Sequence, residues 1–331
     1  MRNLVRFFIF AIAAIGVVAL VPTQSMAQSK KHPSVRFVSG TPTGTWFPSA
    51  AAIAEMANAK YDGQPISVIT GAGGVGNPAH TGAGKSGLGI SYGPFLALAK
   101  RGEELYKTAT PTLCAIGAAP PNLLHMIMDA KFSMDTFANL KSNKTPLKIA
   151  TGATGSTEQF VVKAILKEFG VTFKDIEGWG GRVDFMRTGE RVNSWKNRQV
   201  DVVNSMMQPP HSGWIEMMTV RKSRLLALPE KVRDALAKKW GFQKLVIPGG
   251  LYPNHPDDVK VIGLPFVVYA DTRAVSQELI YDLTAGWATG KDRMVKAHAA
   301  HKKWTPSEMG KGLGIAPCEA TARYYKEQGW K

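Results

Sequence analysis

The stretch "VRFVSGTPTGTWFPSAAAIAEMANA", residues 35 to 59, carries the pattern that decides the fold. Residues 35–40 have the apolar, β-branched character of a buried strand. Residues 47–59 are rich in alanine and hold Pro48 in their first turn, which is typical of a helix start. A loop of glycine and threonine joins the two segments. A strand that leads through a short loop into a helix is the repeating unit of α/β proteins.

The same order returns at "LKIATGATGSTEQFVVKAILKEFG", residues 147 to 170. Here residues 147–152 are the predicted strand, and the helix predicted over residues 157–170 ends at Gly170. Further strands are predicted at residues 66–70, 88–91, 112–118, 123–130, 199–206 and 259–271, with a helix at 94–102 and more helices after residue 276. Two such units predict two α/β lobes that face each other across a cleft.

Between these units, "ISVITGAGGVGNPAHTGAGKS" at residues 66 to 86 contains G-x-G-x-x-G at Gly71, Gly73 and Gly76. The dinucleotide fingerprint also needs an acidic residue about 20 positions further on, and the next acidic residue here is Glu103, beyond the following strand. The phosphate-loop pattern fails as well, because it requires glycine where Ala79 stands. The loop is better explained as a turn that presents backbone N–H groups to another anion.

The N-terminal segment reads as a secretory signal. Arg2 and Arg6 form a basic region, residues 7–21 are apolar, and small residues precede a predicted cleavage after Ala27. A membrane anchor is the alternative, but the apolar run falls short of the roughly 20 residues that a span needs. We therefore expect a periplasmic protein, and this excludes nicotinamide and ATP as cofactors. We expect no cofactor at all.

Charge and motifs narrow the function further. The formal net charge is +16, yet Lys and Arg are scattered along the chain without the dense runs of a nucleic-acid partner. No G-x-S-x-G, H-E-x-x-H or similar pattern occurs, which argues against an exported enzyme. His298 and His301 lack further metal ligands nearby, so no metal site is expected. Cys114 and Cys318 are far apart in sequence, and two buried thiols are favoured over a disulfide.

Four segments together resemble one family. Residues 35–59 are similar to the opening of the TAXI-type solute-binding proteins of tripartite ATP-independent periplasmic (TRAP) transporters. "ISVITGAGGVGNPAHTGAGKSGLGIS", "PLKIATGATGSTEQFVVKAILKEFGV" and "VIPGGLYPNHPDDVKVIGLPFVVYADTRAVSQELIYDL" resemble later parts of that family, in the same order.

This resemblance implies a type II periplasmic-binding-protein fold, in which crossing hinge strands join two α/β lobes and the ligand lies in the cleft. Lobe one is expected at residues 33–125 plus 265–331, and lobe two at residues 126–264. The implied function is a monomeric receptor that captures a small organic anion or amino acid by lobe closure. The receptor would deliver this solute to a TRAP permease driven by an ion gradient. A binding protein coupled to a sensor kinase or chemoreceptor is the alternative, and the sequence does not separate the two.

The candidate ligand residues lie mainly in loops at helix starts, where N–H groups and hydroxyls can replace the hydration of a carboxylate. They are Thr43, Gly44, Thr45 and Trp46 in the first loop, Gly73, Gly74 and Val75 in the second, Tyr92, and Gly155, Ser156 and Thr157 in lobe two, with Trp179, Arg182 and Gln208 added. Arg182 is the predicted bidentate carboxylate clamp. The alternative is that these residues are ordinary caps and turns and that Arg182 is solvated.

The chain departs from the family pattern at two places in these loops. Gly74 stands where the family usually has serine, and Trp46 and Phe47 replace a tyrosine pair. Both changes remove hydroxyl groups. A carboxylate with an apolar or aromatic body therefore suits the predicted site better than glutamate does.

Overall fold

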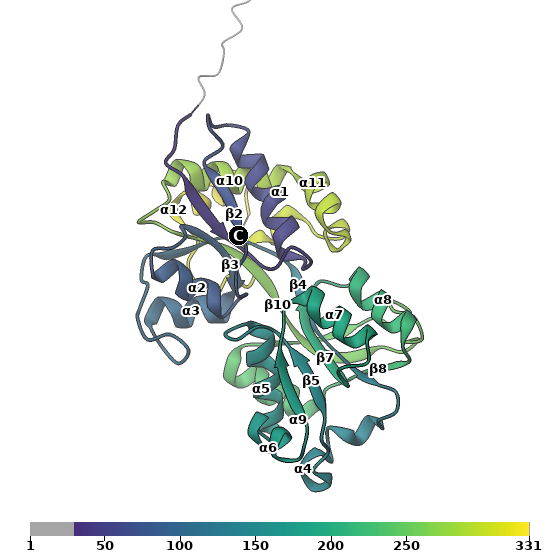
Figure 1. Ribbon diagram of the computed structural model, residues 1–331. Coiled ribbons are helices and arrows are strands. Elements are labelled where there is room, and N and C mark those ends of the chain that lie inside the picture. Colours follow the sequence, from purple (N-terminus) through teal and green to yellow (C-terminus); the bar gives the residue numbers. More distant parts are fainter. Residues whose placement is uncertain (1–29, 331) are drawn as a thin grey trace, which may run out of the picture.

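The computed structural model describes residues 30–330 of the chain (Figure 1). The predicted signal peptide, residues 1–27, lies outside the described residues. The strands are β1 (Val35–Val38), β2 (Ile66–Ile69), β3 (Leu88–Tyr92), β4 (Leu113–Asp129), β5 (Lys148–Thr151), β6 (Arg182–Phe185), β7 (Val202–Met207), β8 (Ser223–Leu225), β9 (Gln243–Ile247) and β10 (Val259–Asp271). The α-helices are α1 (Trp46–Asn58), α2 (Gly76–Gly82), α3 (Gly93–Arg101), α4 (Leu140–Asn143), α5 (Thr157–Glu168), α6 (Phe173–Gly178), α7 (Thr188–Lys196), α8 (Ser212–Val220), α9 (Glu230–Trp240), α10 (Gln277–Thr289), α11 (Lys291–Ala297) and α12 (Glu319–Glu327). Short 3-10 helices are η1 (Met134–Thr136), η2 (Ala299–Lys302) and η3 (Pro306–Gly310).

The strands form one curled sheet that runs through both lobes. Its order is β2-β1-β3-β10-β4-β7-β5-β6, with β8 paired to β4 and β9 paired to β10. The strand pairs that carry the loop-to-helix units are parallel, namely β1 with β2 and β3, and β5 with β6 and β7. Within each set, the parallel strands bring their carboxyl ends to one edge. The two sets run in opposite directions, because three antiparallel pairs, β3 with β10, β10 with β4 and β4 with β7, lie between them. The loops after β1 and β2 therefore face the loop after β5 from opposite sides.

Two long antiparallel strands, β4 and β10, pass from one lobe into the other (Figure 1). Residues 112–118 and 123–130 were expected to be separate strands, and this is wrong because β4 is continuous from Leu113 to Asp129. Pro120 and Pro121 do not end the strand, since they lie where it crosses between the lobes and Pro121 pairs with Pro265 of β10. The two crossing strands form the hinge.

Each lobe packs helices against its part of the sheet (Figure 1). Lobe one contains β1–β3, α1–α3 and α10–α12, and lobe two contains β5–β9 and α4–α9. Leu279, Leu283 and Trp287 of α10 are fully buried, so this stripe belongs to the core as expected from its helical spacing. None of the helices described over residues 30–330 combines the length and apolar character that a membrane span requires.

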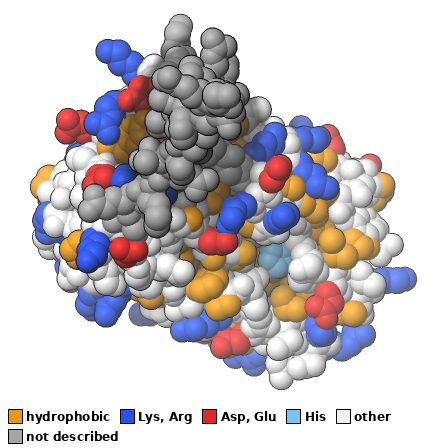
Figure 2. All heavy atoms as spheres, turned by 90° about the horizontal axis from the view of Figure 1, so that it is seen from above, with side chains coloured by type: hydrophobic (Ala, Val, Ile, Leu, Met, Phe, Trp, Pro, Cys, Tyr) orange, Lys and Arg blue, Asp and Glu red, His pale blue; other side chains and the backbone are white. Residues whose placement is uncertain are grey.

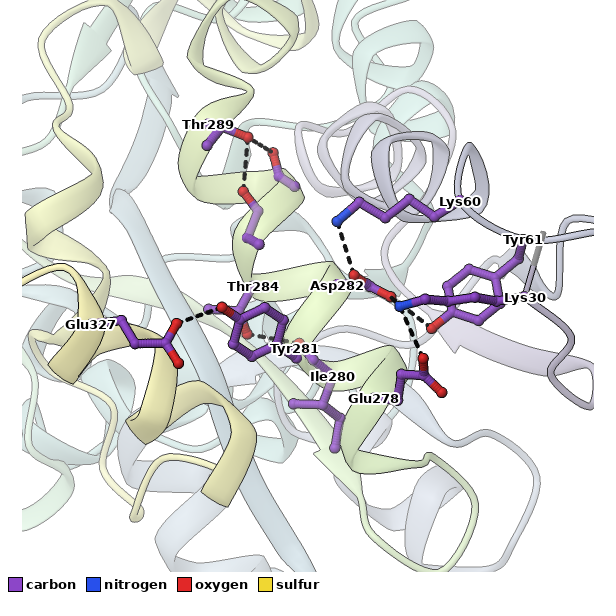
Figure 3. Close-up of polar contacts among 12 residues, drawn as sticks. Lys30, Lys60, Tyr61, Glu278, Ile280, Tyr281, Asp282, Thr284, Thr289 and Glu327 are labelled. Carbon is purple, nitrogen blue, oxygen red and sulfur yellow. Dashed lines mark hydrogen bonds and ion pairs between the residues drawn. The ribbon is translucent and has the colours of Figure 1, made fainter. Parts of the chain in front are cut away.

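A cluster around Asp282 ties the first described residues to α10 (Figure 3). Its buried carboxylate accepts hydrogen bonds from Lys30 Nζ at 2.8 Å, Lys60 Nζ at 2.8 Å and the Tyr61 hydroxyl at 2.9 Å. Lys30 also pairs with Glu278 at 2.9 Å. Burial alone would raise the pKa of Asp282, but these three donors outweigh it and hold the pKa below its usual value. We call these five residues the Asp282 cluster.

The two cysteines are bonded. The expectation of two buried thiols is wrong, because Cys114 of β4 and Cys318, the residue before α12, form a disulfide across 204 positions of sequence. The strand places Cys114 beside the C-terminal segment, where Ala115 pairs with Pro317. Sequence separation gave no sign of this contact. The bond joins the last helix to the hinge strand.

Basic side chains show no single concentrated patch on the face seen in Figure 2. Lys and Arg are spread over it with acidic and apolar side chains between them. This agrees with their scattered positions in the sequence.

Candidate functional site

A cavity of about 280 Å³ lies between the two lobes. Its walls come from the segments after β1, β2, β5 and β6 and from the last residues of β7, which is where open α/β sheets bind their ligands. The lining residues are Gly40, Thr41, Gly44, Thr45, Trp46, Thr70, Gly71, Ala72, Gly73, Gly74, His80, Tyr92, Gly152, Ala153, Ser156, Thr157, Glu158, Met186, Arg187, Thr188, Arg191, Ser205, Met206, Met207 and His211. Below we call it the cleft cavity.

The lobes touch each other around the cleft cavity. The Thr41 hydroxyl of lobe one donates to the Thr188 hydroxyl of lobe two at 3.1 Å. The rings of Phe95 and Phe160 meet edge to face with their centroids 5.3 Å apart. Groups from both lobes therefore line the same cavity.

Trp46 and Tyr92 form the aromatic wall of lobe one. Trp46 begins α1 directly after the first glycine-threonine loop, and its ring centroid lies 5.1 Å from that of Tyr92 in an edge-to-face contact. Both side chains are buried, and the indole N–H of Trp46 has no hydrogen-bond partner among residues 30–330. Burial raises the pKa of Tyr92 well above its usual value, so the phenol stays neutral and can donate.

Gly74 is required by the ring of Tyr92. A Cβ atom at position 74 would lie 2.5 Å from Tyr92 Cδ2 and 2.9 Å from Thr157 Oγ1. Both distances are shorter than side chains tolerate without movement. Glycine at position 74 is thus coupled to the large aromatic residue across the loop. The adjacent Gly73 has φ of 99°, a conformation that favours glycine.

The lobe-two wall begins at the N-terminus of α5. Ser156 caps this helix, because its hydroxyl oxygen accepts the Gln159 N–H at 3.2 Å. Thr157 is buried beside it, and its hydroxyl has no hydrogen-bond partner in the described part of the chain. The positive end of the α5 dipole therefore faces the cleft cavity together with one free hydroxyl group.

Arg191 is the most unusual lining residue. Its side chain comes from α7, is only 2% exposed, and forms no ion pair with the described acidic residues. Its guanidinium donates to the Asn204 carbonyl and to the Thr188 hydroxyl, but its Nε–H has no partner among the residues that the structure describes. Burial lowers the pKa of Arg191, although arginine remains charged at any physiological pH. A buried positive charge without a counter-ion is costly, and an anion in the cleft cavity would compensate it.

Glu158 supplies the opposite charge. It is half-buried near the start of α5, lines the cleft cavity, and its carboxylate makes no hydrogen bond or ion pair with the described residues. Its negative charge opposes the lowering of the Arg191 pKa, so the two groups interact electrostatically without forming a salt bridge. The cleft cavity thus offers one buried cation and one partly buried anion. Arg187 also lines it but is exposed to solvent.

Two histidines also line the cleft cavity. His211 caps α8 by accepting the Gly213 N–H at Nδ1, 3.1 Å away, and burial lowers its pKa to about 4. His80 contacts the Ser86 hydroxyl at 3.1 Å, and burial is the main cause that lowers its pKa. Both imidazoles are neutral near pH 7, which leaves Arg191 as the buried permanent positive charge of the site.

The structure brings eight of the predicted residues together. They are Gly44, Thr45, Trp46, Gly73, Gly74, Tyr92, Ser156 and Thr157. Four others lie next to lining residues without lining the cleft cavity themselves, namely Thr43, Val75, Gly155 and Gln208. The N–H of Gly155 is already used, since it donates to Gln159 Oε1 at 2.7 Å.

The remaining predicted residues, Trp179 and Arg182, lie elsewhere. Trp179 and Arg182 were predicted to contact the ligand, but Trp179 directly follows α6 and Arg182 begins the edge strand β6. Arg182 is exposed on β6, where it binds Asp184 at 2.7 Å, and Trp179 ends α6 and packs against the core. Gln208 is buried and donates to the Pro120 carbonyl at 2.9 Å, which places it at the hinge.

Arg191 was missed because a helical arginine is ordinarily solvated. A signal was nevertheless present: Thr188, Arg191 and Trp195 are spaced i, i+3 and i+7, which places them on one face of a helix. All three are buried in α7. Many of the other unpredicted lining residues flank predicted ones in the loops after β1, β2 and β5. The rest include residues after β6 and at the end of β7, and their place at the cleft depends on the sheet order.

Comparison with known proteins gives one family and a shared fold. The model of the NMT1-like family matches residues 37–329. No curated protein matches the sequence. The structure of MatC from Rhodopseudomonas palustris with bound malate is 14% identical, with a TM-score of 0.52 over 89% of this chain and 98% of that chain.

Two further solved structures have similar coverage. A protein from Bordetella bronchiseptica RB50 is 15% identical, with a TM-score of 0.51 over 90% of this chain and 98% of that one. A TctC solute binding protein from Polaromonas is 13% identical, with a TM-score of 0.47 over 90% and 98% of the two chains. The likeness to the first two structures shows that the chain has the two-lobe fold of periplasmic binding proteins, as predicted.

Proposed function

The chain belongs to the NMT1-like family, and from this premise we propose that it is a periplasmic receptor that captures a small organic carboxylate by lobe closure. The single observation that carries the proposal is Arg191, a buried guanidinium without an acidic partner in the cleft cavity. A carboxylate accepts two parallel hydrogen bonds from a guanidinium, and this pairing is among the strongest available to a small anion.

Donors from both lobes support closure as the binding mechanism. Trp46 of lobe one and Thr157 and Arg191 of lobe two all line the cleft cavity, and each has a buried donor without a partner within residues 30–330. A ligand that pairs with all three is bound fully only when the lobes are together. Its binding therefore shifts the population toward the closed arrangement.

The size and walls of the cleft cavity define the solute class. Its volume of about 280 Å³ is slightly below the range of about 300–1,000 Å³ that is typical of pockets for drug-sized ligands. Besides its polar groups it has apolar walls, formed by Trp46, Tyr92, Met186, Met206 and Met207. These features fit a metabolite with one carboxylate and an apolar or aromatic body.

Glu158 favours a second candidate, an amino acid. An α-ammonium group would pair with its carboxylate while the α-carboxylate pairs with Arg191. The two candidates make different demands on Glu158, because a plain carboxylate gains nothing from a nearby negative charge. Glu158→Gln should weaken an amino acid but leave a plain carboxylate equally or more tightly bound.

We further propose that the receptor delivers its solute to a TRAP permease. Support comes from the ordered resemblance of four sequence segments to the TAXI-type receptors and from the signal-like N-terminus. The disulfide between Cys114 and Cys318 fits an oxidising compartment such as the periplasm. A role in sensing would use the same closure with a different membrane partner.

A ligand screen of the mature protein tests the proposal. Thermal unfolding should be followed with small carboxylates, aromatic acids, amino acids, and neutral sugars as the contrast. A solute present at 100 times its Kd stabilises the folded state by about 2.7 kcal/mol, which gives a clear upward shift in Tm. A shift with one carboxylate class supports the receptor function. Shifts only with neutral sugars would contradict the role given to Arg191.

A further inference from the structure

A second cavity lies against the hinge. It has a volume of about 380 Å³ and shares no lining residue with the cleft cavity. Its lining residues are Ala118, Ala119, Pro120 and Pro121 of β4, Gln243 of β9, Pro265 of β10, and Ala300, Lys303, Trp304, Glu308, Lys311 and Gly312 from the C-terminal segment. We call it the hinge cavity.

The backbone at this cavity is poor in hydrogen-bond donors. Pro120, Pro121 and Pro265 have no N–H group, and Pro121 pairs with Pro265 where the register of β4 and β10 becomes irregular. Fewer ladder bonds therefore resist bending at this point than elsewhere along the two strands.

The walls of the hinge cavity belong to both lobes. Gln243 lies in lobe two, whereas residues 300–312 lie in lobe one. Rotation of the lobes about the hinge must change the distance between these walls. A molecule bound here would consequently have different affinities for the open and closed arrangements.

The chemistry of the lining identifies the kind of ligand. Alanine and proline side chains and the nearly fully buried Trp304 provide an apolar surface. Lys303 and Lys311 add positive charge at exposed positions. Lys311 lies 3.9 Å from Glu308, whereas Lys303 forms no ion pair with any residue of the described range 30–330. One cation is thus left without a partner beside an apolar surface.

Trp304 also connects this surface to the cleft cavity through packed rings. It stacks on Trp287 with centroids 5.9 Å apart, and Trp287 stacks on Phe266 of β10 at 6.4 Å. Phe266 in turn contacts Trp46 at 5.9 Å, and Trp46 lines the cleft cavity. The hinge cavity is therefore built on the rigid core of lobe one, which gives it a defined shape on that side.

We propose that the hinge cavity is a second ligand site, for a small organic anion with an apolar body. The apolar walls would bury the body of the ligand, and Lys303 would pair with its anionic group. This site is independent of the solute proposed for the cleft.

The test uses 8-anilinonaphthalene-1-sulfonate, an aromatic sulfonate whose emission rises in apolar surroundings. Titration of the mature protein should give saturable binding. The double variant Lys303→Glu with Lys311→Glu should weaken this binding by about tenfold or more, equivalent to about 1.4 kcal/mol. Ala300→Phe, which fills the hinge cavity from a half-buried position, should abolish it. Lys231→Glu with Lys238→Glu, two exposed lysines of α9, is the matched charge control and should bind as the wild type does.

A cleft variant separates this proposal from the proposed function. Arg191→Met should leave the binding of the dye unchanged, whatever it does to carboxylates in the cleft. Absence of saturable binding would overturn the proposal. It would also be overturned by equal affinity in the hinge variants, or by loss of binding in Arg191→Met, since the dye would then occupy the cleft cavity. Thermal unfolding of each variant verifies that the comparison is made on folded protein.

Discussion

Replacement of Arg191 with methionine should remove most of the affinity for the cleft ligand. Methionine has a similar length and fills most of the same volume, but it has neither the charge nor the donors of arginine. The guanidinium is 2% exposed, so water screens its pairing with a bound carboxylate only weakly. Truncation of one partner in such a buried, hydrogen-bonded charge pair costs about 2–5 kcal/mol. The Kd should therefore rise by a factor of about 30 to several thousand.

Isothermal titration with the carboxylate found in the screen measures this change directly. Arg182→Met is the matched control, because it removes the same charge from an exposed position on β6 and should leave the Kd almost unchanged. Arg191→Lys should be intermediate, since lysine keeps the charge but lacks the planar pair of donors. The reasoning is refuted if folded Arg191→Met binds the carboxylate as tightly as the wild type, or if Arg182→Met is the variant that loses binding.

Three further changes test the packing around the site and the stability of the fold. Gly74→Ser should destabilise the protein by about 1–3 kcal/mol in denaturant unfolding, because the new Cβ overlaps the ring of Tyr92. Adding Tyr92→Ala to this variant should relieve the cost. If Gly74→Ser alone is as stable as the wild type, the loop moves freely enough to avoid the overlap. Asp282→Asn should lower the free energy of unfolding by about 1–3 kcal/mol near pH 7. This difference from the wild type should shrink as the pH falls below about 4, because a carboxylate whose pKa is lowered by folding stabilises the protein only above its folded pKa. A difference that stays constant with pH would contradict the ionised Asp282 cluster. Replacing Cys114 and Cys318 together by serine should lower the free energy of unfolding by about 2–5 kcal/mol, and the wild type should show no thiol available for alkylation before reduction.

The repeated strand, loop and helix were accessible from sequence because each depends on neighbouring residues. Local composition was enough to predict the small-residue loops before α1 and α5, and a hydrophobic run was enough to predict the full extent of β10. The continuity of β4 did not, because Pro120 and Pro121 ordinarily end a strand. Here they sit at the crossing point between the lobes, where Pro121 pairs with another proline.

The residues of the candidate site also differ in whether the sequence could place them at the cleft. Trp46, Ser156 and Thr157 lie directly at helix starts, and the sequence pattern was enough to place them at the cleft. Arg182 and Arg191 both occur in a polar stretch, and only the sheet order decides which of them faces the cleft. Arg182 begins the edge strand β6, which pairs with β5. Arg191 reaches the cleft from the next helix.

The disulfide shows a third limit of local reasoning. Cys114 and Cys318 are 204 residues apart, and nothing near either cysteine indicates its partner. Their contact depends on the C-terminal segment returning to pair beside β4. Contacts of this kind follow from the complete topology.

The most direct test of the central claim is a crystal structure of the mature protein with the carboxylate identified in the screen. The account predicts that the carboxylate lies in the cleft cavity with its oxygens about 2.7–2.9 Å from the guanidinium nitrogens of Arg191, and with Trp46 and Thr157 also donating to the ligand. A ligand whose carboxylate binds elsewhere in the cleft, with the Nε–H of Arg191 still without a partner, would contradict it.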